Sequence, residues 1–212
     1  MLAHDLRTPI AGIKLMSGLL EGASENKIKE CSTNIIDCCD NTLTMMDDLL
    51  SHIQMSREGV RLNLRPLIIE DEIREVCNEF SPQIVQKKIT INLPVTQTSL
   101  ALDAIKFKQI LSNLISNAIK FSFTKGDVNV LVEENDTHVD MVVIDNGIGI
   151  TEELIPEVFD IFTNARREGT EGEKSTGIGL SITKRLVELH NASIEVISKL
   201  NQGTEFRVSF PK

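Results

Sequence analysis

The first residues with obvious chemistry are a histidine and an aspartate near the start of the chain, in the segment HDLRTP at residues 4–9. Asp5 can accept a hydrogen bond from one ring nitrogen of His4, which leaves the other nitrogen as a free lone pair, the nucleophilic form near neutral pH. Thr8 follows one helical turn later on the same predicted surface, and Pro9 should bend the helix because it removes a backbone donor. An exposed histidine is often only a surface residue, but these neighbours favour a nucleophile.

A second group of polar residues follows the pattern of one helix face. Asn113, Asn117 and Lys120 are spaced four and three residues apart in a predicted helix over 103–121, whose other side is apolar and whose cap is Asp103. Asparagine is a mediocre helix former, so two amides and a lysine in this pattern suggest oxygen ligands for a hard cation beside a charge for phosphate. A solvated helix face is the alternative for this segment taken alone.

An acidic residue ends a strongly apolar predicted strand in HVDMVVIDNGIGI, residues 138–150. An ionised Asp145 only accepts hydrogen bonds, so it suits the exocyclic amine of adenine and would repel the carbonyl of guanine. Gly147 and Gly149 let the backbone turn and approach a ligand closely. The pattern predicts binding of ATP rather than GTP, although Asp-x-Gly-x-Gly alone often marks only a turn after a strand.

Glycines also precede a predicted helix at about residues 177–190. Residues 163–176 are polar and charged, which favours a mobile lid over packed structure. Thr176, Gly177 and Gly179 then lead into the helix, whose free amide groups and dipole favour phosphate oxygens. Together with the asparagine side chains of the helix over 103–121 and the adenine-selective Asp145, this segment predicts a nucleotide site.

Composition narrows the class of protein. The 212 residues are 41% hydrophobic and 25% charged, as in soluble globular proteins, and no apolar run approaches the roughly 20 residues that span a bilayer. A formal net charge of −9 disfavours DNA and RNA as partners, because binding to their phosphates depends on lysine and arginine. The four cysteines fit no metal-ligand spacing and are predicted to be reduced core residues. We therefore expect a soluble chain that makes no membrane contact of its own.

Two helices, each with a seam of apolar residues along one side, are expected to position His4. Apolar residues recur every three or four positions from Leu2 to Leu20 and again from Ile28 to Leu50, with an interruption at residues 22–24. This pattern predicts a hairpin of two unequal helices. Because a single hairpin would expose a wide apolar stripe, the sequence predicts a homodimer in which residues 1–58 of two chains form a four-helix bundle.

The remaining residues, 59–212, alternate between strand and helix periods, which predicts an α+β domain with helices against a mixed sheet. Strands are predicted at 60–64, 89–93, 127–133, 138–144, 193–199 and 204–210, and helices at 68–80, 103–121 and 177–190.

Five segments, HDLRTP, NLISNAIKFS, DNGIGI, FDIF and STGIGL, occur in this order and closely resemble the H, N, G1, F and G2 boxes of bacterial two-component sensor histidine kinases. The resemblance covers essentially the whole chain. It implies a dimerisation and histidine-phosphotransfer hairpin, followed by an α/β sandwich ATP-binding domain of the GHKL type, which is shared with DNA gyrase and mismatch-repair ATPases.

The resemblance also implies a role for each matching residue. His4 would take the γ-phosphoryl group of ATP, Asp5 would accept the proton on its other ring nitrogen, and Thr8 would position water for dephosphorylation of the partner. Asn117 would hold magnesium, with Asn113 as its helper.

The remaining matches concern the nucleotide. Lys120 would reach the phosphates, Asp145 would bind the adenine amine, and Thr204 matches a family threonine near the adenine edge. The pocket and lid would be shaped by the G1- and G2-box residues Gly147, Gly149, Thr176, Gly177, Gly179 and Leu180.

Two phenylalanines, Phe159 and Phe162, would anchor the hinge of the lid. Many relatives carry an arginine directly after the second phenylalanine, where this chain has Thr163. Arg166 or Arg167 could take its place.

The leading hypothesis is an ATP- and Mg²⁺-dependent protein-histidine kinase that phosphorylates His4, passes the group to an aspartate in the receiver domain of a response regulator, and also dephosphorylates that regulator. One alternative is a non-catalytic dimeric scaffold, a pseudokinase that binds a response regulator. Another is a serine kinase or ATPase on the same nucleotide fold. The chain is expected to be cytoplasmic, either alone or as part of a membrane-anchored sensor.

Overall fold

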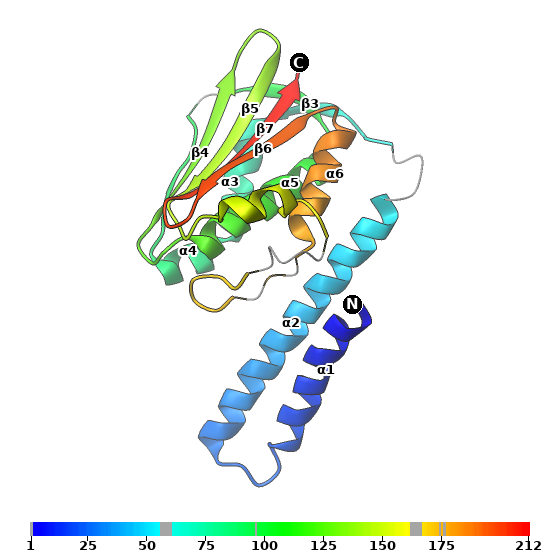
Figure 1. Cartoon of the computed structure of the whole chain (residues 1–212), viewed down its shortest axis with the longest axis vertical. Coiled ribbons are helices and arrows are strands. Elements are labelled where there is room, and N and C mark those ends of the chain that lie inside the picture. The colour runs from blue at the N-terminus through cyan, green and yellow to red at the C-terminus, as the bar shows by residue number, and fades with distance from the viewer. Residues whose placement is uncertain (1, 56–60, 96, 162–166, 174, 176) are drawn as a thin grey trace. The chain divides into compact units, whose positions relative to one another are not determined.

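The computed structural model describes residues 2–55, 61–95, 97–161, 167–173, 175 and 177–212. The chain divides into two compact units, Met1–Ser56 and Arg57–Lys212 (Figure 1). Among the residues described, no helix is both long enough and apolar enough to cross a membrane.

The first unit is a helical hairpin. Helix α1 spans Leu2–Gly18 and helix α2 spans Glu25–Met55, which confirms the two helices predicted from the seams. The Sγ–H of Cys38 in α2 donates a hydrogen bond to the carbonyl of Pro9 in α1 at 3.4 Å. Helix α1 continues through Pro9, and the bend expected there stays a prediction.

Apolar side chains lie both between the two helices and on their outer surface. Cys31 is buried, with 4% of its surface exposed, whereas Ile36 and Leu43 are each 59% exposed. Further large apolar side chains exposed along the hairpin are Ile10, Leu15, Leu19, Ile28, Met46 and Leu50. The hairpin of one chain therefore leaves extensive apolar surface in contact with water, which favours association with another surface.

The second unit combines two sheets with four α-helices among its described residues. The helices are α3 (Ile69–Glu79), α4 (Ser81–Lys87), α5 (Ala104–Phe121) and α6 (Gly179–Leu189), with a short 3-10 helix η1 (Glu152–Glu157). The strands are β1 (Arg65–Ile68), β2 (Thr90–Asn92), β3 (Ser99–Leu102), β4 (Asp127–Glu134), β5 (His138–Asp145), β6 (Ser193–Lys199) and β7 (Gly203–Pro211). Helices α3, α5 and α6 cover one face of the large sheet, so the unit is an α/β sandwich (Figure 1).

The large sheet has the strand order β2-β4-β5-β7-β6, and β2 pairs in parallel with β4 while the other neighbours are antiparallel. Strand β5 is central, which explains its nearly continuous apolar sequence. Phe107 of α5 packs edge-on against Phe210 of β7, with ring centroids 5.7 Å apart. This packing fixes the first turn of α5 against the sheet near the start of β5, since Phe210 is the register partner of Val139.

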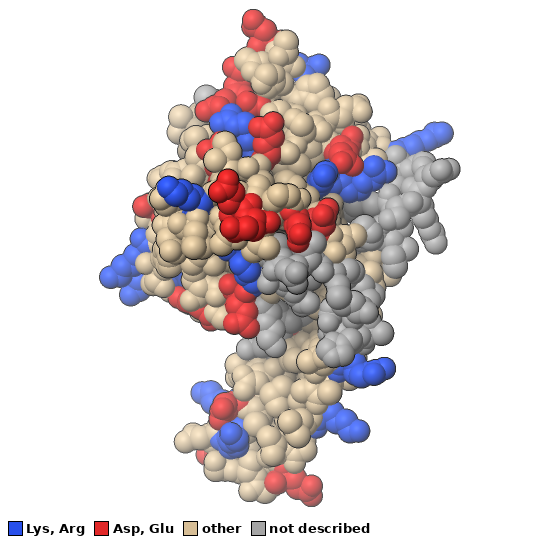
Figure 2. All heavy atoms as spheres, in the orientation of Figure 1, with Lys and Arg blue, Asp and Glu red and all other residues tan. Residues whose placement is uncertain are grey.

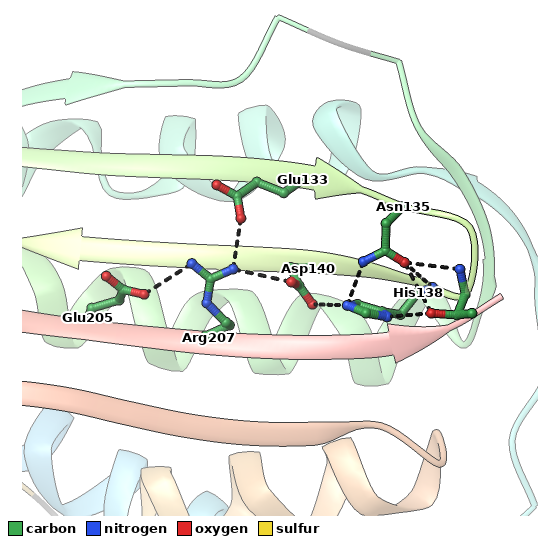
Figure 3. Close-up of polar contacts among 7 residues, drawn as sticks. Glu133, Asn135, His138, Asp140, Glu205 and Arg207 are labelled. Carbon is green, nitrogen blue, oxygen red and sulfur yellow. Dashed lines mark hydrogen bonds and ion pairs between the residues drawn. The ribbon is translucent and has the colours of Figure 1, made fainter.

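The opposite face of the sheet carries a polar cluster around Arg207 (Figure 3). Its guanidinium bonds Glu133 on β4 at 2.7 Å, Asp140 on β5 at 3.2 Å and Glu205 on β7 at 3.2 Å. The ring of His138 lies 3.5 Å from the second oxygen of Asp140. One cation therefore links three strands and reduces the repulsion among three carboxylates. Over the visible side of this unit as a whole, acidic and basic side chains lie next to each other (Figure 2).

One predicted strand is wrong. Residues 61–64 form no strand, and β1 instead begins at Arg65 and pairs antiparallel with β3. The backbone N–H of Asn63 donates to Asp103 Oδ2 at 2.9 Å, so it serves the cap of α5 instead of a strand ladder. The short elements β3, α4 and η1 were not predicted, whereas the other predicted helices and strands are confirmed to within two residues at each end.

Candidate active site

Helix α5 carries the three polar residues that the sequence singled out. Its start is set by Asp103, whose carboxylate accepts a hydrogen bond from the Lys106 amide at 3.1 Å, as predicted. Its apolar side is buried in the core, and Asn113, Asn117 and Lys120 lie half-buried along the other side. One rigid helix therefore presents two amides and an ammonium in a row.

The Asn113 amide joins α5 to the start of α6. Its Nδ2 donates to the Gly179 carbonyl at 3.1 Å and to the Thr183 hydroxyl at 3.2 Å. Thr183 is fully buried. Asn113 thus holds the first turn of α6 beside the polar side of α5, an arrangement that the spacing of the asparagines alone did not indicate.

The residues present fit a magnesium ion that takes few ligands from the protein and the rest from phosphate oxygens and water. Among the described residues, no group of three or more His, Cys, Asp or Glu side chains could hold a metal ion. Asn117 offers an amide oxygen on the half-buried side of α5. Magnesium commonly accepts few protein oxygens and completes its shell with phosphates and water.

Asp145 lies at the end of central strand β5 and is only 4% exposed. Its Oδ1 accepts a hydrogen bond from the Gly147 amide at 2.9 Å. Burial raises the pKa of this carboxyl to about 6, while the amides of Gly147 and Thr204 and the charge of Arg167 act in the opposite direction. At neutral pH the site therefore contains a buried carboxylate that can accept hydrogen bonds from an amine.

The glycines after Asp145 are required by close backbone contacts. A Cβ on Gly147 would lie 1.9 Å from the Phe121 carbonyl oxygen, and one on Gly149, whose φ is +62°, would lie 1.9 Å from the Lys199 carbonyl oxygen. The Ile148 amide donates to the Phe121 carbonyl at 3.1 Å. These contacts place the segment after β5 between the end of α5 and the turn that joins β6 to β7.

Thr204 lies directly opposite Asp145 in the β5–β7 register and is buried. Its hydroxyl is 2.9 Å from that of Ser198, which also donates to the Gly203 carbonyl at 2.8 Å. Sequence reasoning missed Ser198, because its contacts depend on the pairing of β6 with β7.

The N-terminus of α6 fits the predicted phosphate site in its backbone geometry. Gly177 has a φ of +72°, and Gly179 and Leu180 form the first helical positions. The N-cap, Ile178, provides no side-chain hydrogen bond to the first turn. Such a helix start favours an anion, because its amides and dipole point outward. Thr176 lies outside the described residues.

Two cationic side chains lie near the Phe121 ring at the end of α5. Lys120 Nζ is 5.4 Å from the ring centroid, and the guanidinium carbon of Arg167 is 5.3 Å from it. Arg167 Nη1 also donates to the Gly149 carbonyl. The sequence left Arg166 and Arg167 as alternatives. The structure brings Arg167 to the site, and Arg166 lies outside the described residues.

A buried lysine that the sequence did not reveal connects this region to residues 169–173. Lys87 is 2% exposed, and its Nζ donates to the Ile119 and Lys120 carbonyls at 3.1 and 2.8 Å. It also donates to Thr170 Oγ1 at 2.8 Å and forms an ion pair with Glu173 at 2.5 Å. Lys87 thus ties the last turn of α5 to a segment more than 80 residues later in the chain.

Some of the remaining predicted residues lie outside the part of the chain that the structure describes. His4 and Asp5 are within α1, but their side chains are not among those described, and Thr8 is exposed on the same helix. Phe159 packs edge-on against Phe206 of β7, with centroids 6.3 Å apart, which fits a hinge anchor. Phe162 lies outside the described residues.

Comparisons with known families agree with this geometry. Residues 102–212 match the model of the histidine kinase-, DNA gyrase B-, and HSP90-like ATPases, the class that the sandwich and the site around Asp145 define. Residues 1–56 match the His Kinase A (phospho-acceptor) domain. The chain belongs to the sensor histidine kinase family.

Named relatives are similar over the whole chain. The sensor protein KdpD of Clostridium acetobutylicum is 28% identical over 215 residues, covering 100% of this chain and 24% of the relative. Full-length ShkA, solved in complex with AMPPNP, is 28% identical with a TM-score of 0.73 and covers 99% of this chain and 44% of its own. Histidine kinase ThkA, solved with the response regulator protein TrrA, shares the fold at 23% identity, with a TM-score of 0.79 over 99% of this chain and 59% of that chain. The chain thus spans about a quarter of the length of KdpD.

Proposed function

We propose that this chain is an ATP-dependent protein-histidine kinase core in which residues 1–58 accept and transfer the phosphoryl group and residues 59–212 bind ATP. The observation that carries the proposal is the buried Asp145 carboxylate at the end of β5, followed by close-packed glycines, in a chain that begins with a phospho-acceptor domain. The relative ShkA, whose structure contains AMPPNP, supports an adenine nucleotide as the ligand.

Asp145 would accept a hydrogen bond from the adenine amine. Its pKa of about 6 leaves it mostly ionised at neutral pH, so it accepts but does not donate. Guanine presents a carbonyl where adenine has its amine, and two acceptors facing each other repel. The site would therefore select ATP over GTP. Thr204, which faces Asp145 across the β5–β7 pair, would border the same edge of the base.

The phosphates would lie between the polar side of α5 and the start of α6. Asn117 would hold Mg²⁺, which supplies charge neutralisation to the phosphates when it is bound. Lys120 would add a second positive charge, and the first amides of α6, with Thr176, Gly177, Gly179 and Leu180 around them, would donate to phosphate oxygens. Asn113 would act indirectly, because it holds the start of α6 in place.

His4 would attack the γ-phosphorus of ATP with one ring nitrogen, and the bond between that phosphorus and the β–γ bridging oxygen would break, releasing ADP. Asp5 would accept the proton of the other ring nitrogen and so keep the attacking nitrogen unprotonated. The phosphoryl group would then pass to an aspartate of a response regulator. Positioning and charge neutralisation, rather than covalent help, account for most of this catalysis.

Two partners are proposed, a second copy of the chain and a response regulator. The exposed apolar residues of the hairpin, among them Ile36 and Leu43, favour pairing of two chains into a four-helix bundle. A response regulator is proposed as the acceptor because the related fold of ThkA was solved with TrrA. Thr8, which is exposed on α1, would position water for dephosphorylation of that regulator. We further propose that the chain is the cytoplasmic part of a sensor.

The test is incubation of the chain with γ-labelled ATP and Mg²⁺. We expect a label on the protein that is lost in acid and kept in base, that is absent from His4→Ala, and that moves to a receiver domain. An acid-stable label would indicate a serine kinase instead. Binding of a receiver domain without any affinity for ATP would indicate the non-catalytic scaffold.

A further inference from the structure

Arg167 is half-buried next to the residues assigned to adenine. Its Nη1 donates to the Gly149 carbonyl, and its guanidinium carbon lies 5.3 Å from the centroid of the Phe121 ring. Its charge also lowers the pKa of Asp145 against the larger effect of burial. One side chain therefore interacts with three groups, Asp145, Gly149 and Phe121, which we call the purine site.

These three groups lie close together because of backbone contacts between their segments. The Phe121 carbonyl accepts the Ile148 amide at 3.1 Å, and a Cβ on Gly147 would touch the same carbonyl. A buried carboxylate, a glycine backbone and an aromatic ring are the groups that would contact an adenine base through its amine, its edge and its face. A guanidinium is also flat, carries N–H donors and stacks on aromatic rings, so it can satisfy the same groups.

Hydrogen bonds and an ion pair also hold residues 169–173, which follow Arg167 closely, in place. Two residues after Arg167, the Gly169 amide donates to the Glu173 carbonyl at 2.8 Å, and Thr170 donates to the Ser122 carbonyl at 2.6 Å. The buried ammonium of Lys87 pairs with Glu173 at 2.5 Å. Residues 169–173 are thus fastened to the end of α5, beside Phe121. An anchor two residues away keeps Arg167 within reach of the purine site and lowers the entropy lost when it binds there.

We propose that Arg167 is an intramolecular competitor of ATP: its guanidinium occupies the purine site in the nucleotide-free protein and must leave before adenine enters. The inference rests on the proposed function, since it assumes that the base binds at Asp145. The apparent nucleotide affinity is then the intrinsic affinity reduced by the fraction of molecules in which the site is open. If the contact is formed four-fifths of the time, the apparent Kd is raised about fivefold.

Adenosine distinguishes this role from that of a phosphate ligand. It carries no phosphates, so its affinity does not change when a phosphate contact or a long-range attraction for anions is removed. A competitor at the base, by contrast, weakens the binding of adenosine and of ATP alike. Removing the side chain should therefore tighten adenosine binding, whereas removing a phosphate ligand should leave adenosine unaffected and weaken ATP.

The experiment measures the Kd of adenosine and of Mg-ATP by calorimetry for the whole chain, Arg167→Ala, Arg167→Lys and the control Arg185→Ala. Arg185 is an exposed arginine on α6 whose partner is Glu188. We expect Arg167→Ala to bind adenosine about fivefold more tightly. The adenosine affinity of Arg167→Lys should fall between those of Arg167→Ala and the wild type, because lysine lacks the planar guanidinium that stacks on an aromatic ring. The control should match the wild type. Melting temperatures of all variants check that the fold is retained.

The possible failures are distinguishable. If the wild type binds ATP but Arg167→Ala binds adenosine with equal or lower affinity, the competitor role is wrong and the proposed kinase function stands. If neither protein binds adenosine or ATP, both the competitor role and the proposed function are wrong.

Discussion

Replacing Asp145 with asparagine should stabilise the protein and at the same time impair its binding of ATP. Burial raises the pKa of this carboxyl from 3.8 to about 6. The folded chain then holds the Asp145 proton more tightly than the unfolded chain does, so the contribution of this group to stability is greatest below pH 3.8 and is lost as the pH rises through about 6. Since one pKa unit corresponds to about 1.4 kcal/mol, the ionised carboxylate costs about 3 kcal/mol of unfolding free energy at pH 7.

Asparagine keeps the shape of the side chain and an oxygen for the Gly147 amide, but it carries no charge. Asp145→Asn should therefore melt at a higher temperature than the wild type at pH 8, and the difference should disappear near pH 4. For a unit of this size, about 3 kcal/mol corresponds to roughly 6–12 °C. Calorimetry of the whole chain at several pH values measures the difference. A variant that is no more stable than the wild type at pH 8 refutes the argument from burial.

The same variant tests the adenine assignment. A hydrogen bond to a charged acceptor contributes about 1.5–3 kcal/mol, so ATP should bind at least about tenfold more weakly. GTP should lose less, because the repulsion between its carbonyl and the carboxylate is removed. Asp136→Asn, which neutralises an exposed carboxylate in the turn between β4 and β5, is the control and should bind both nucleotides as the wild type does. Unchanged ATP affinity in Asp145→Asn contradicts the assignment.

Two further substitutions, one of them with a control, test the ion pairs of the second unit. Lys87→Met should lower the unfolding free energy by about 2 kcal/mol, because it removes the buried ammonium that donates to two carbonyls at the end of α5 and pairs with the part-exposed Glu173, and urea unfolding measures this loss. Lys108→Met, which removes a half-buried lysine paired with an exposed glutamate, should have a much smaller effect; an equal effect would contradict the role of burial. Arg207→Met should cost about 1 kcal/mol, more at low salt, because the carboxylates around it (Figure 3) then repel one another without a shared cation. A loss that does not depend on salt would show that repulsion is not the cause.

The parts of the fold that could be predicted have a local cause. The seams of three and four residues predicted α1 and α2, and the alternating or continuous apolar runs predicted β4 and β5, because side-chain direction repeats with the backbone period. The cap of α5 was predicted from Asp103, since its hydrogen bond reaches only to Lys106. The strand expected at 60–64 failed for the opposite reason, because its backbone bonds depend on partners about 40 residues away.

The site was predictable wherever a residue type determines the chemistry. A carboxylate accepts hydrogen bonds, asparagine offers oxygen to a cation and glycine permits close approach wherever they stand, so Asp145, Asn117 and Gly147 could be selected from their types and spacing. The position of Arg167 over Phe121 was not predictable, since a charge run in a polar segment does not reveal which arginine turns inward.

The sequence by itself determined the order of helices and strands, the glycines and the acid of the nucleotide segment, and the family to which the chain belongs. Only the tertiary structure decided that Asp145 is buried deeply enough to raise its pKa, that Lys87 pairs with Glu173, and that Arg167 lies at the purine site. The reason is physical. Backbone periods and side-chain chemistry act over a few residues, whereas burial and ion pairing depend on which distant segments the packed fold brings together.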